Sequence, residues 1–487
     1  MKISRLMSTQ HPDNVTVPHF AEKPIMDGDD EVKEAHYAFT LGIDEQLWDA
    51  EGKEVDNFVV KKLLTRYEDY FHNHILGKDK FLTLRVPNPD IEKHEGKILL
   101  EALHSIPRNF DIATAFYAHD IPPVFEVVMP MCDSEKQIIR VHEYYKRFII
   151  KNQEKKIYNN DITLAHWLGP MNPKDIRVTP LFETKEAILH ADASVQKYLR
   201  YEKIKNQQRV WFARSDPALQ YGSLAAVLLI KIGLTKLHSL QEKTSIDILP
   251  ILGCGSAPFR GNCTPHNASN LLAGYPSMHT FTVQSAFKYD FPMPEVRNAV
   301  KTFNTARRKE PLPIDIPAAL KIINNAEREY QKALPIIAGK VNLLTSHIPE
   351  RRKRKLHIGL FGYARQHQST PLPRAIKFCA SLYSLGLPPE LLGLSAVSEK
   401  DLEKIRDWYK NIDTDMADAL QYLNKDNLHL FPELKQKILH GTSLFEYETN
   451  QEHKEATTKI VEALRQKNIT ALQGHIVEAG KIRKFLG

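Results

Sequence analysis

The chain has 487 residues, of which 42% are hydrophobic and 26% are charged, the profile of a soluble globular protein with enough apolar material for a large core. Its 66 Lys and Arg against 59 Asp and Glu give a net charge of +7, a mild excess that suits an anionic substrate as well as a nucleic acid. No apolar run near the start is long enough for a signal peptide, and the longest run, residues 224–230, is too short to span a bilayer.

Short β-rich runs alternate with longer helical patterns along most of the chain. Helical periodicity is clearest over residues 185–205 and 217–235. Most of the β-rich runs are apolar on both faces, as parallel strands covered by helices are. The predicted strands are 81–86, 123–131, 176–183, 208–215, 246–253, 279–287 and 356–365. Seven such runs, with one more unrecognised, predict an α/β fold, a (β/α)8 TIM-type barrel.

The remaining chain is predicted to be mainly helical, with additional helices concentrated at the C-terminal end. From about residue 398 only helical patterns occur. We therefore divide the chain into an N-terminal segment, 1–75, a barrel core, 76–375, and a C-terminal helical region packed on the barrel, 376–487.

Two compositional features bear on location and partners. The four cysteines, at positions 132, 254, 263 and 379, form no CxxC pair, which favours a reducing compartment and hence the cytoplasm. The densest basic run, RRKRK at 351–355, is interpreted as a solvated loop before a buried strand. It has no interleaved aromatic residues, so a nucleic-acid-binding protein is the less favoured alternative.

Charged residues occur where the predicted strands end. Because the carboxyl ends of barrel strands meet at one rim, these side chains should converge there. The candidates are Arg85, Glu183, Arg214, Asp216, Arg260, Arg365 and Arg374. Each has an ordinary explanation when taken alone, such as Asp216 acting as a helix N-cap before Pro217. Taken together they indicate an active site.

The chemistry of this set is specific. Two carboxylates from neighbouring strands can hold a hard divalent cation that keeps several waters, as Mg²⁺ prefers. Arginines match the oxygens of phosphates and carboxylates. The loop GCGSAPFRG (253–261) adds backbone N–H groups that an anion can approach, because glycine leaves room. The expected substrate is a small, multiply anionic molecule such as a phosphorylated carboxylic acid.

Seven motifs together resemble phosphoenolpyruvate carboxylase, and most closely its smaller, archaeal-type form. In chain order they are STQHPDN, RVPNP, TPLFET, ARSDPALQYG, GSAPFRG, PRAI and AGKIRKFLG. The resemblance covers essentially the full length. Compared with the larger bacterial and plant form, STQHPDN is similar to TAHPTE, which makes His11 the expected catalytic histidine. The shared PLFET and the similar ARSDPAL imply that Glu183 and Asp216 bind the metal, Mg²⁺ or Mn²⁺.

The resemblance also assigns the other site residues. Arg260 falls on the second arginine of the larger form's glycine-rich loop and is expected to be catalytic. The expected substrate-binding residues are Arg85, Arg365, Arg374, Gly255 and Ser256. Cys254 and Leu219 stand where the larger form has an arginine and a lysine, so two positive charges are missing. We hypothesise that Arg214 replaces part of that charge in catalysis, because alternate strand residues share a face.

The resemblance implies that bicarbonate carboxylates phosphoenolpyruvate to oxaloacetate and phosphate, an anaplerotic carbon fixation. Carboxyphosphate and a metal-stabilised enolate are the implied intermediates. His11, in a turn expected to fold back over the barrel mouth, would accept the carboxyl proton, and Arg260 would hold the departing phosphate. The alternative is another Mg²⁺-dependent barrel lyase or aldolase acting on enolpyruvate or 2-oxo acids. Exposed C-terminal helices favour a homodimer or homotetramer, with neither nucleic acid nor membrane as a partner.

Overall fold

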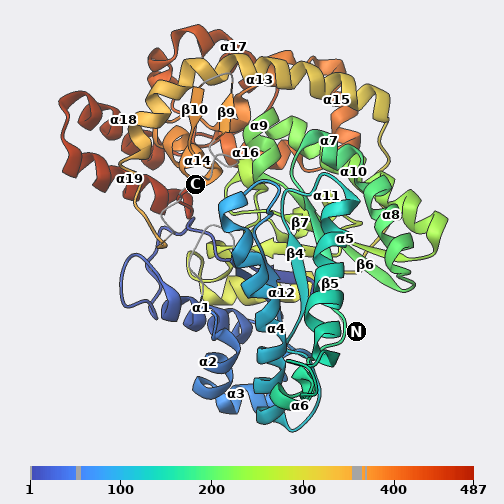
Figure 1. The fold of residues 1–487 in the computed structure, drawn as a ribbon. Helices are drawn as coiled ribbons and strands as arrows, with labels where there is room; N and C mark the ends of the chain where they lie inside the picture. The colour runs from blue at the N-terminus through green and yellow to red at the C-terminus, as the bar shows by residue number, and fades with distance from the viewer. Residues whose placement is uncertain (1–2, 51–55, 354–364, 368–369) are drawn as a thin grey trace.

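The structure is a computed structural model that describes residues 3–50, 56–353, 365–367 and 370–487 (Figure 1). Eight parallel strands form a closed barrel, in which each strand pairs with the next and β1 pairs with β8. The strands are β1 Leu6–Ser8, β2 Glu45–Asp49, β3 Phe81–Arg85, β4 Val124–Met129, β5 Arg177–Phe182, β6 Gln207–Ala213, β7 Asp247–Gly253 and β8 Thr280–Val283. The predicted (β/α)8 barrel is therefore confirmed.

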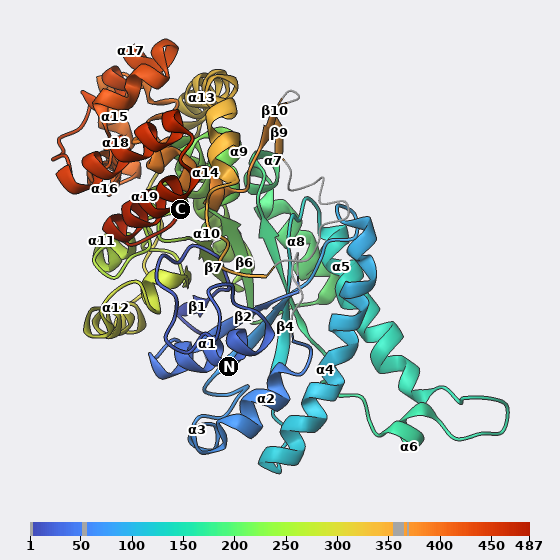
Figure 2. The same ribbon diagram turned by 90° about the vertical axis from the view of Figure 1, so that its left-hand side faces the viewer.

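Helices surround the barrel, and the last of them gather at one end of the molecule (Figures 1 and 2). Those up to β8 are α1 Gly28–Thr40, α2 Val59–Arg66, α3 Glu68–Asn73, α4 Gly96–Tyr117, α5 Glu135–Tyr144, α6 Leu164–Leu168, α7 Lys185–Leu189, α8 Ala191–Glu202, α9 Ser215–Tyr221, α10 Ser223–Thr244 and α11 Ala268–Gly274. Those after it are α12 Met293–Thr305, α13 Ile316–Thr345, α14 Ala375–Ser384, α15 Glu399–Trp408, α16 Ile412–Leu420, α17 Pro432–Thr442, α18 Gln451–Gln466 and α19 Ile469–Arg483.

Six of the seven predicted strands are confirmed as β3 to β8, and the seventh is wrong as a barrel strand. Of the predicted run 356–365, residues 356–364 lie outside the described residues. Arg365 begins β9 (Arg365–His367), which pairs only with β10 (Thr370–Leu372) in a separate two-stranded sheet. The barrel is instead completed by β1 and β2, both within the segment 1–75.

The predicted helix 217–235 is divided in two at Gly222. This residue has φ +92°, and a Cβ there would come within 3.1 Å of the Tyr330 ring, so the chain turns where only glycine fits. The following helix, α10, is long and apolar enough to cross a membrane, and within the described residues it alone meets that test. Because 78% of its apolar window is buried inside the protein, it is a core helix.

Inward-facing side chains of the strands fill the barrel in layers. At the bottom, the buried Arg209 of β6 donates to Glu45 of β2 (2.7 and 2.9 Å), to Glu126 of β4 (3.0 Å) and to Thr280 of β8 (3.2 Å). Two residues further along their strands, Leu47, Val128 and Trp211 belong to one apolar cluster. Side chains alternate between the two faces of a strand, so the next inward positions open at the rim.

The charged layer gives a stability prediction. Replacing Arg209 by Met leaves Glu45 and Glu126 buried without their cation, and the expected loss is about 3–5 kcal/mol. Burial raises the pKa of Glu45 while Arg209 opposes it. Removing the guanidinium raises that pKa further, so protonation should recover part of the loss at acid pH.

Thermal unfolding at neutral and acid pH measures both effects. The control is Arg140→Met, which breaks an exposed 3.0 Å ion pair with Asp90 and should change stability by less than about 0.5 kcal/mol. Equal melting temperatures for the two variants would contradict the prediction.

Candidate active site

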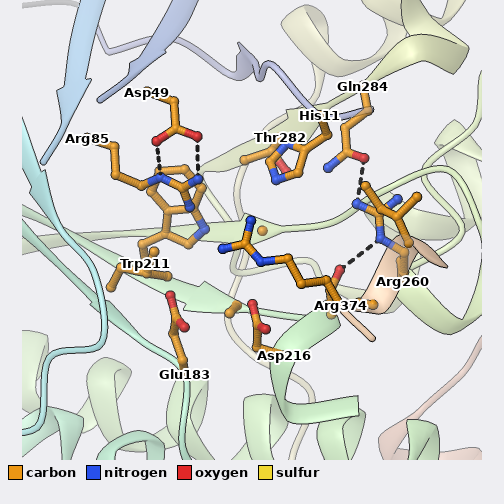
Figure 3. A pocket seen from close by; sticks show the side chains of 16 residues that line it. His11, Asp49, Arg85, Glu183, Trp211, Asp216, Arg260, Thr282, Gln284 and Arg374 are labelled. Carbon is orange, nitrogen blue, oxygen red and sulfur yellow. Dashed lines mark hydrogen bonds and ion pairs between the residues drawn. The ribbon is translucent and has the colours of Figure 1, made fainter. Parts of the chain in front are cut away.

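The candidate site is the uppermost inward layer of the barrel, open at the carboxyl ends of the strands. Asp49 ends β2 four residues beyond Glu45, and Gln284 directly follows β8, four residues beyond Thr280; both line this layer. One cavity lies between these strand ends and the loops after them, as Figure 3 shows. Its polar lining residues are His11, Asp49, Arg85, Glu183, Ser215, Asp216, Arg260, Thr282, Gln284 and Arg374.

The two predicted metal-binding carboxylates face this cavity together. Glu183 directly follows β5 and is 3% exposed, and Asp216 lies in the first turn of α9. Both side chains point into the cavity from the same side in Figure 3. The alternative of Asp216 as an N-cap is wrong, because the cap residue is Arg214 and no side chain caps the helix.

Arg85 faces the cavity as expected and is held there by a residue that the sequence did not reveal. Its Nε and Nη2 donate to the two carboxylate oxygens of Asp49 at 2.8 and 2.6 Å. Such a two-pronged pair fixes the plane of the guanidinium. Asp49 ends β2 and Arg85 ends β3, and the two residues are register partners in the sheet. The pair thus presents an oriented cation at the rim.

Arg260 is buried against the cavity, and each of its three guanidinium nitrogens donates one hydrogen bond to the protein. Nη2 donates to Gln284 Oε1 at 2.7 Å, Nη1 to the Gly487 carbonyl at 2.8 Å, and Nε to Ser215 Oγ at 3.2 Å. Asp13 adds an ion pair at 3.6 Å. The guanidinium is therefore locked in place by groups from four separate parts of the chain.

The glycine-rich loop, predicted to offer N–H groups to an anion, packs closely around Arg260. The N–H of Gly255 donates to the Arg260 carbonyl at 2.8 Å and so is not available to a ligand. A Cβ at Gly255 would lie 2.7 Å from the Arg260 guanidinium carbon, which explains the glycine. Ser256 is buried and donates to Asp13 at 2.8 Å. Neither Gly255 nor Ser256 lines the cavity.

His11 lies in a turn that follows β1, so it is itself a strand-end residue. Thr9 continues the pairing of β1 with β8 through its N–H, which donates to Val283 O at 3.0 Å. Thr9 Oγ1 and His11 Nδ1 share a hydrogen bond of 2.9 Å. The imidazole lines the cavity, near Thr282 and Gln284 in Figure 3. The turn thus brings a histidine to the rim without folding back from a distance.

Arg214 does not line the cavity, contrary to the expectation that it supplies a missing charge there. Strand β6 ends at Ala213, and Arg214 has αR backbone angles as the N-cap of α9, so strand alternation no longer applies to it. Its buried guanidinium donates to Ser223 Oγ at 2.8 Å. Cys254 is also turned away, with its thiol donating to Thr282 O at 3.2 Å.

Arg374 is the N-cap residue of α14, and its side chain extends into the cavity beside Asp216 (Figure 3).

Glu92 lies in the loop after β3 and is buried. Burial raises the pKa of Glu92 to about 7, against the opposing charge of Arg374. The side chain of Arg365, the remaining predicted arginine, lies outside the described part of the chain.

Five further lining residues with polar or aromatic side chains were missed by the sequence reasoning. They are Asp49, Trp211, Ser215, Thr282 and Gln284. Trp211 and Thr282 sit within strands that were predicted, at inward positions. Gln284 follows β8 directly, so its strand-end position was a usable signal. Asp49 ends a strand that was itself unrecognised.

The chain is similar to known proteins along its whole length. The family model described as phosphoenolpyruvate carboxylase matches residues 3–487. Curated phosphoenolpyruvate carboxylases of Methanospirillum hungatei and Methanothermobacter thermautotrophicus are 48% and 46% identical to this chain, each over 100% of both sequences. That of Pyrococcus abyssi is 49% identical over 87% of this chain and 89% of its own. The chain belongs to the phosphoenolpyruvate carboxylase family, in its smaller archaeal-type form.

Proposed function

We propose that this protein carboxylates phosphoenolpyruvate with bicarbonate to give oxaloacetate and phosphate. The observation that carries the proposal is a single cavity, in a chain of this family, that collects the carboxylates of Glu183 and Asp216, the Asp49–Arg85 pair, two further arginines and a histidine. The arginines suit a substrate with both a phosphate and a carboxylate. The carboxylates suit a divalent cation, and the histidine suits proton transfer.

The cation is proposed to be Mg²⁺ or Mn²⁺, held by Glu183 and Asp216. The described residues contain no group of three or more His, Cys, Asp or Glu side chains placed to hold a metal. Glu183 and Asp216, which both line the cavity, would supply two carboxylate ligands. This donor set fits a hard cation that completes its coordination with water and substrate oxygens. When bound, the cation would act as a Lewis acid that offsets negative charge on the phosphate and on the enolate oxygen.

Arg85 and Arg374 are proposed to bind the phosphate and carboxylate of phosphoenolpyruvate, and Arg365 to assist them. Held in this way, the phosphorus can be attacked in line by a bicarbonate oxygen. The bond from phosphorus to the enol oxygen breaks, which yields carboxyphosphate and the enolate of pyruvate. Asp49 contributes by fixing the plane of Arg85.

His11 is proposed to accept the carboxyl proton of carboxyphosphate. We assign this to Nε2, because Nδ1 is engaged with Thr9. As the proton leaves, the carbon–oxygen bond to phosphate breaks, CO2 forms beside the enolate, and carbon–carbon bond formation gives oxaloacetate. Arg260 would hold the departing phosphate, since its guanidinium is already fixed at the cavity wall.

We further propose that the enzyme works in the cytoplasm as a homodimer or homotetramer, without nucleic acid or membrane as partner. The full-length similarity to metabolic enzymes supports the cytoplasmic location.

Substitution of the carboxylates tests the proposed reaction. Glu183→Gln and Asp216→Asn remove the charges assigned to the cation, so oxaloacetate formation from phosphoenolpyruvate, bicarbonate and Mg²⁺ should fall by about 100-fold or more. The control is Glu186→Gln, an exposed position on α7 three residues after Glu183, which should keep full activity. Full activity in both cavity variants, or turnover that needs no bicarbonate, would contradict the proposal.

The Asp49–Arg85 pair gives a second test. Asp49→Asn keeps the shape but removes the charge that orients Arg85. The KM for phosphoenolpyruvate should rise about tenfold, the effect of losing roughly 1.4 kcal/mol of charge-assisted hydrogen bonding. Asp90→Asn, an exposed change in the loop after β3, is the control for steady-state kinetics. An unchanged KM in Asp49→Asn would show that this pair does not position the substrate.

A further inference from the structure

The first two residues of the basic run 351–355 are buried, although its composition predicts a solvated loop. Arg351 and Arg352 are 7% and 3% exposed, while Lys353 is exposed, and residues 354–355 lie outside the description. Buried arginines are costly unless every donor finds a partner. The partners of these two therefore indicate what the run does.

Both arginines bind the main chain of the turn that carries His11. Arg352 Nε donates to the His11 carbonyl at 3.2 Å. Arg351 donates to the carbonyls of Asn14 and Val15 at 3.0 and 3.2 Å. The chain around them is fixed as well, because Met26 N–H donates to the Arg351 carbonyl at 3.0 Å and Lys353 N–H donates to the Met26 carbonyl at 2.9 Å.

A buried carboxylate, Glu34 of α1, joins this contact to the other side of the turn. Its Oε1 accepts from Arg352 Nη2 at 2.6 Å, from Lys288 Nζ at 2.8 Å and from the Tyr289 hydroxyl at 2.9 Å. Lys288 Nζ also donates to the Thr9 carbonyl at 2.9 Å. Glu34 thus connects two cations that each bind a main-chain carbonyl, one at Thr9 and one at His11.

The cluster formed by Glu31, Glu34, Lys288, Tyr289 and Arg352 has equal numbers of carboxylates and cations, and it lies apart from the cavity. Arg352 also pairs with Glu31 at 3.3 Å, so two carboxylates face Arg352 and Lys288. Burial alone would raise the pKa of Glu34, but the two cations prevail and lower it to about 2. The carboxylate is therefore ionised throughout the physiological range. None of its members lines the cavity, so the cluster can act on the reaction only through the turn.

We propose that Arg352, anchored on Glu34, is a positioning residue that sets where the His11 imidazole stands in the cavity. The inference rests on the proposed proton transfer to His11. Thr9 and His11 are held by their carbonyls, and the ring is tied back to Thr9 Oγ1. Loosening one carbonyl lets the ring move, and displacements of about 1 Å are enough to cost about 100-fold in rate.

Displacement of His11 has a chemical signature. Bicarbonate attack on phosphorus does not need the histidine, so carboxyphosphate and the enolate still form. Without a proton acceptor in place, water hydrolyses carboxyphosphate back to bicarbonate and phosphate, and the enolate takes a proton to become pyruvate. The balance is phosphoenolpyruvate plus water giving pyruvate plus phosphate. Phosphate release is then no longer matched by oxaloacetate.

The test compares Arg352→Gln and Arg352→Lys with the wild type, measuring phosphate, pyruvate and oxaloacetate together. Lys keeps the charge beside Glu34, which protects folding, but lacks the planar fork that reaches both Glu34 and the His11 carbonyl. We expect kcat for oxaloacetate to fall up to about 100-fold, an excess of phosphate and pyruvate, and an unchanged KM for phosphoenolpyruvate. The matched control is Lys353→Gln, which removes the neighbouring exposed charge and should behave as wild type.

His11→Asn distinguishes a failure of the positioning role of Arg352 from a failure of the proposed proton transfer to His11. If it uncouples phosphate from oxaloacetate while the folded Arg352 variants keep one oxaloacetate per phosphate and the wild-type kcat, the positioning inference is overturned. If His11→Asn itself remains coupled and fully active, the proposed proton transfer fails instead. Should Arg352→Gln not fold, as its melting curve would show, Arg352→Lys decides the matter.

Discussion

Closure of the barrel by β1 against β8 is the constraint on which the whole site depends. The register sets Met7 opposite Thr282 and Ser8 opposite Val283, so the chain leaving β1 must emerge beside the chain leaving β8. His11 and Gln284 then meet at one rim. Because every strand alternates its side chains, the same closure also turns Asp49, Arg85 and Glu183 inward. The active site is therefore the last layer of the barrel interior. In this layer the inward-facing side chains line a cavity, whereas in the layers below they pack against one another.

Ion pairs with carboxylates orient the arginine side chains in and around the barrel. Arg209 at the bottom and Arg85 at the rim are each held by carboxylates from neighbouring or facing strands, and Arg352 is held by carboxylates of α1. Taking a guanidinium out of water is favourable only when its partners are in place, so each pair has a narrow geometry. Of these three cations only Arg85 lines the cavity, so it stands there in a plane that is already fixed, which lowers the cost of ordering it.

Much of this was readable from the sequence because it depends on local pattern. Six strands and the C-terminal helices follow from apolar runs and helical periodicity, and Glu183 and Asp216 follow from their places after strands. What failed depends on pairing between distant segments. The three-residue strand β1 is too short to show a recognisable pattern. Without it, the run 356–365 was counted as one of the eight barrel strands. Arg214 was misplaced because strand β6 ends at Ala213, two residues before the predicted end, and periodicity does not fix such a boundary.

The claim that distant strand ends share one cation is tested most directly by diffraction from crystals of the wild-type protein soaked in Mn²⁺. Anomalous scattering from manganese locates the ion without any assumption about the protein. The account predicts one strong peak in the barrel cavity, within coordination distance of carboxylate oxygens of both Glu183 and Asp216. A peak bound elsewhere, or a cavity that stays empty of manganese while those two carboxylates point to separate partners, would contradict it.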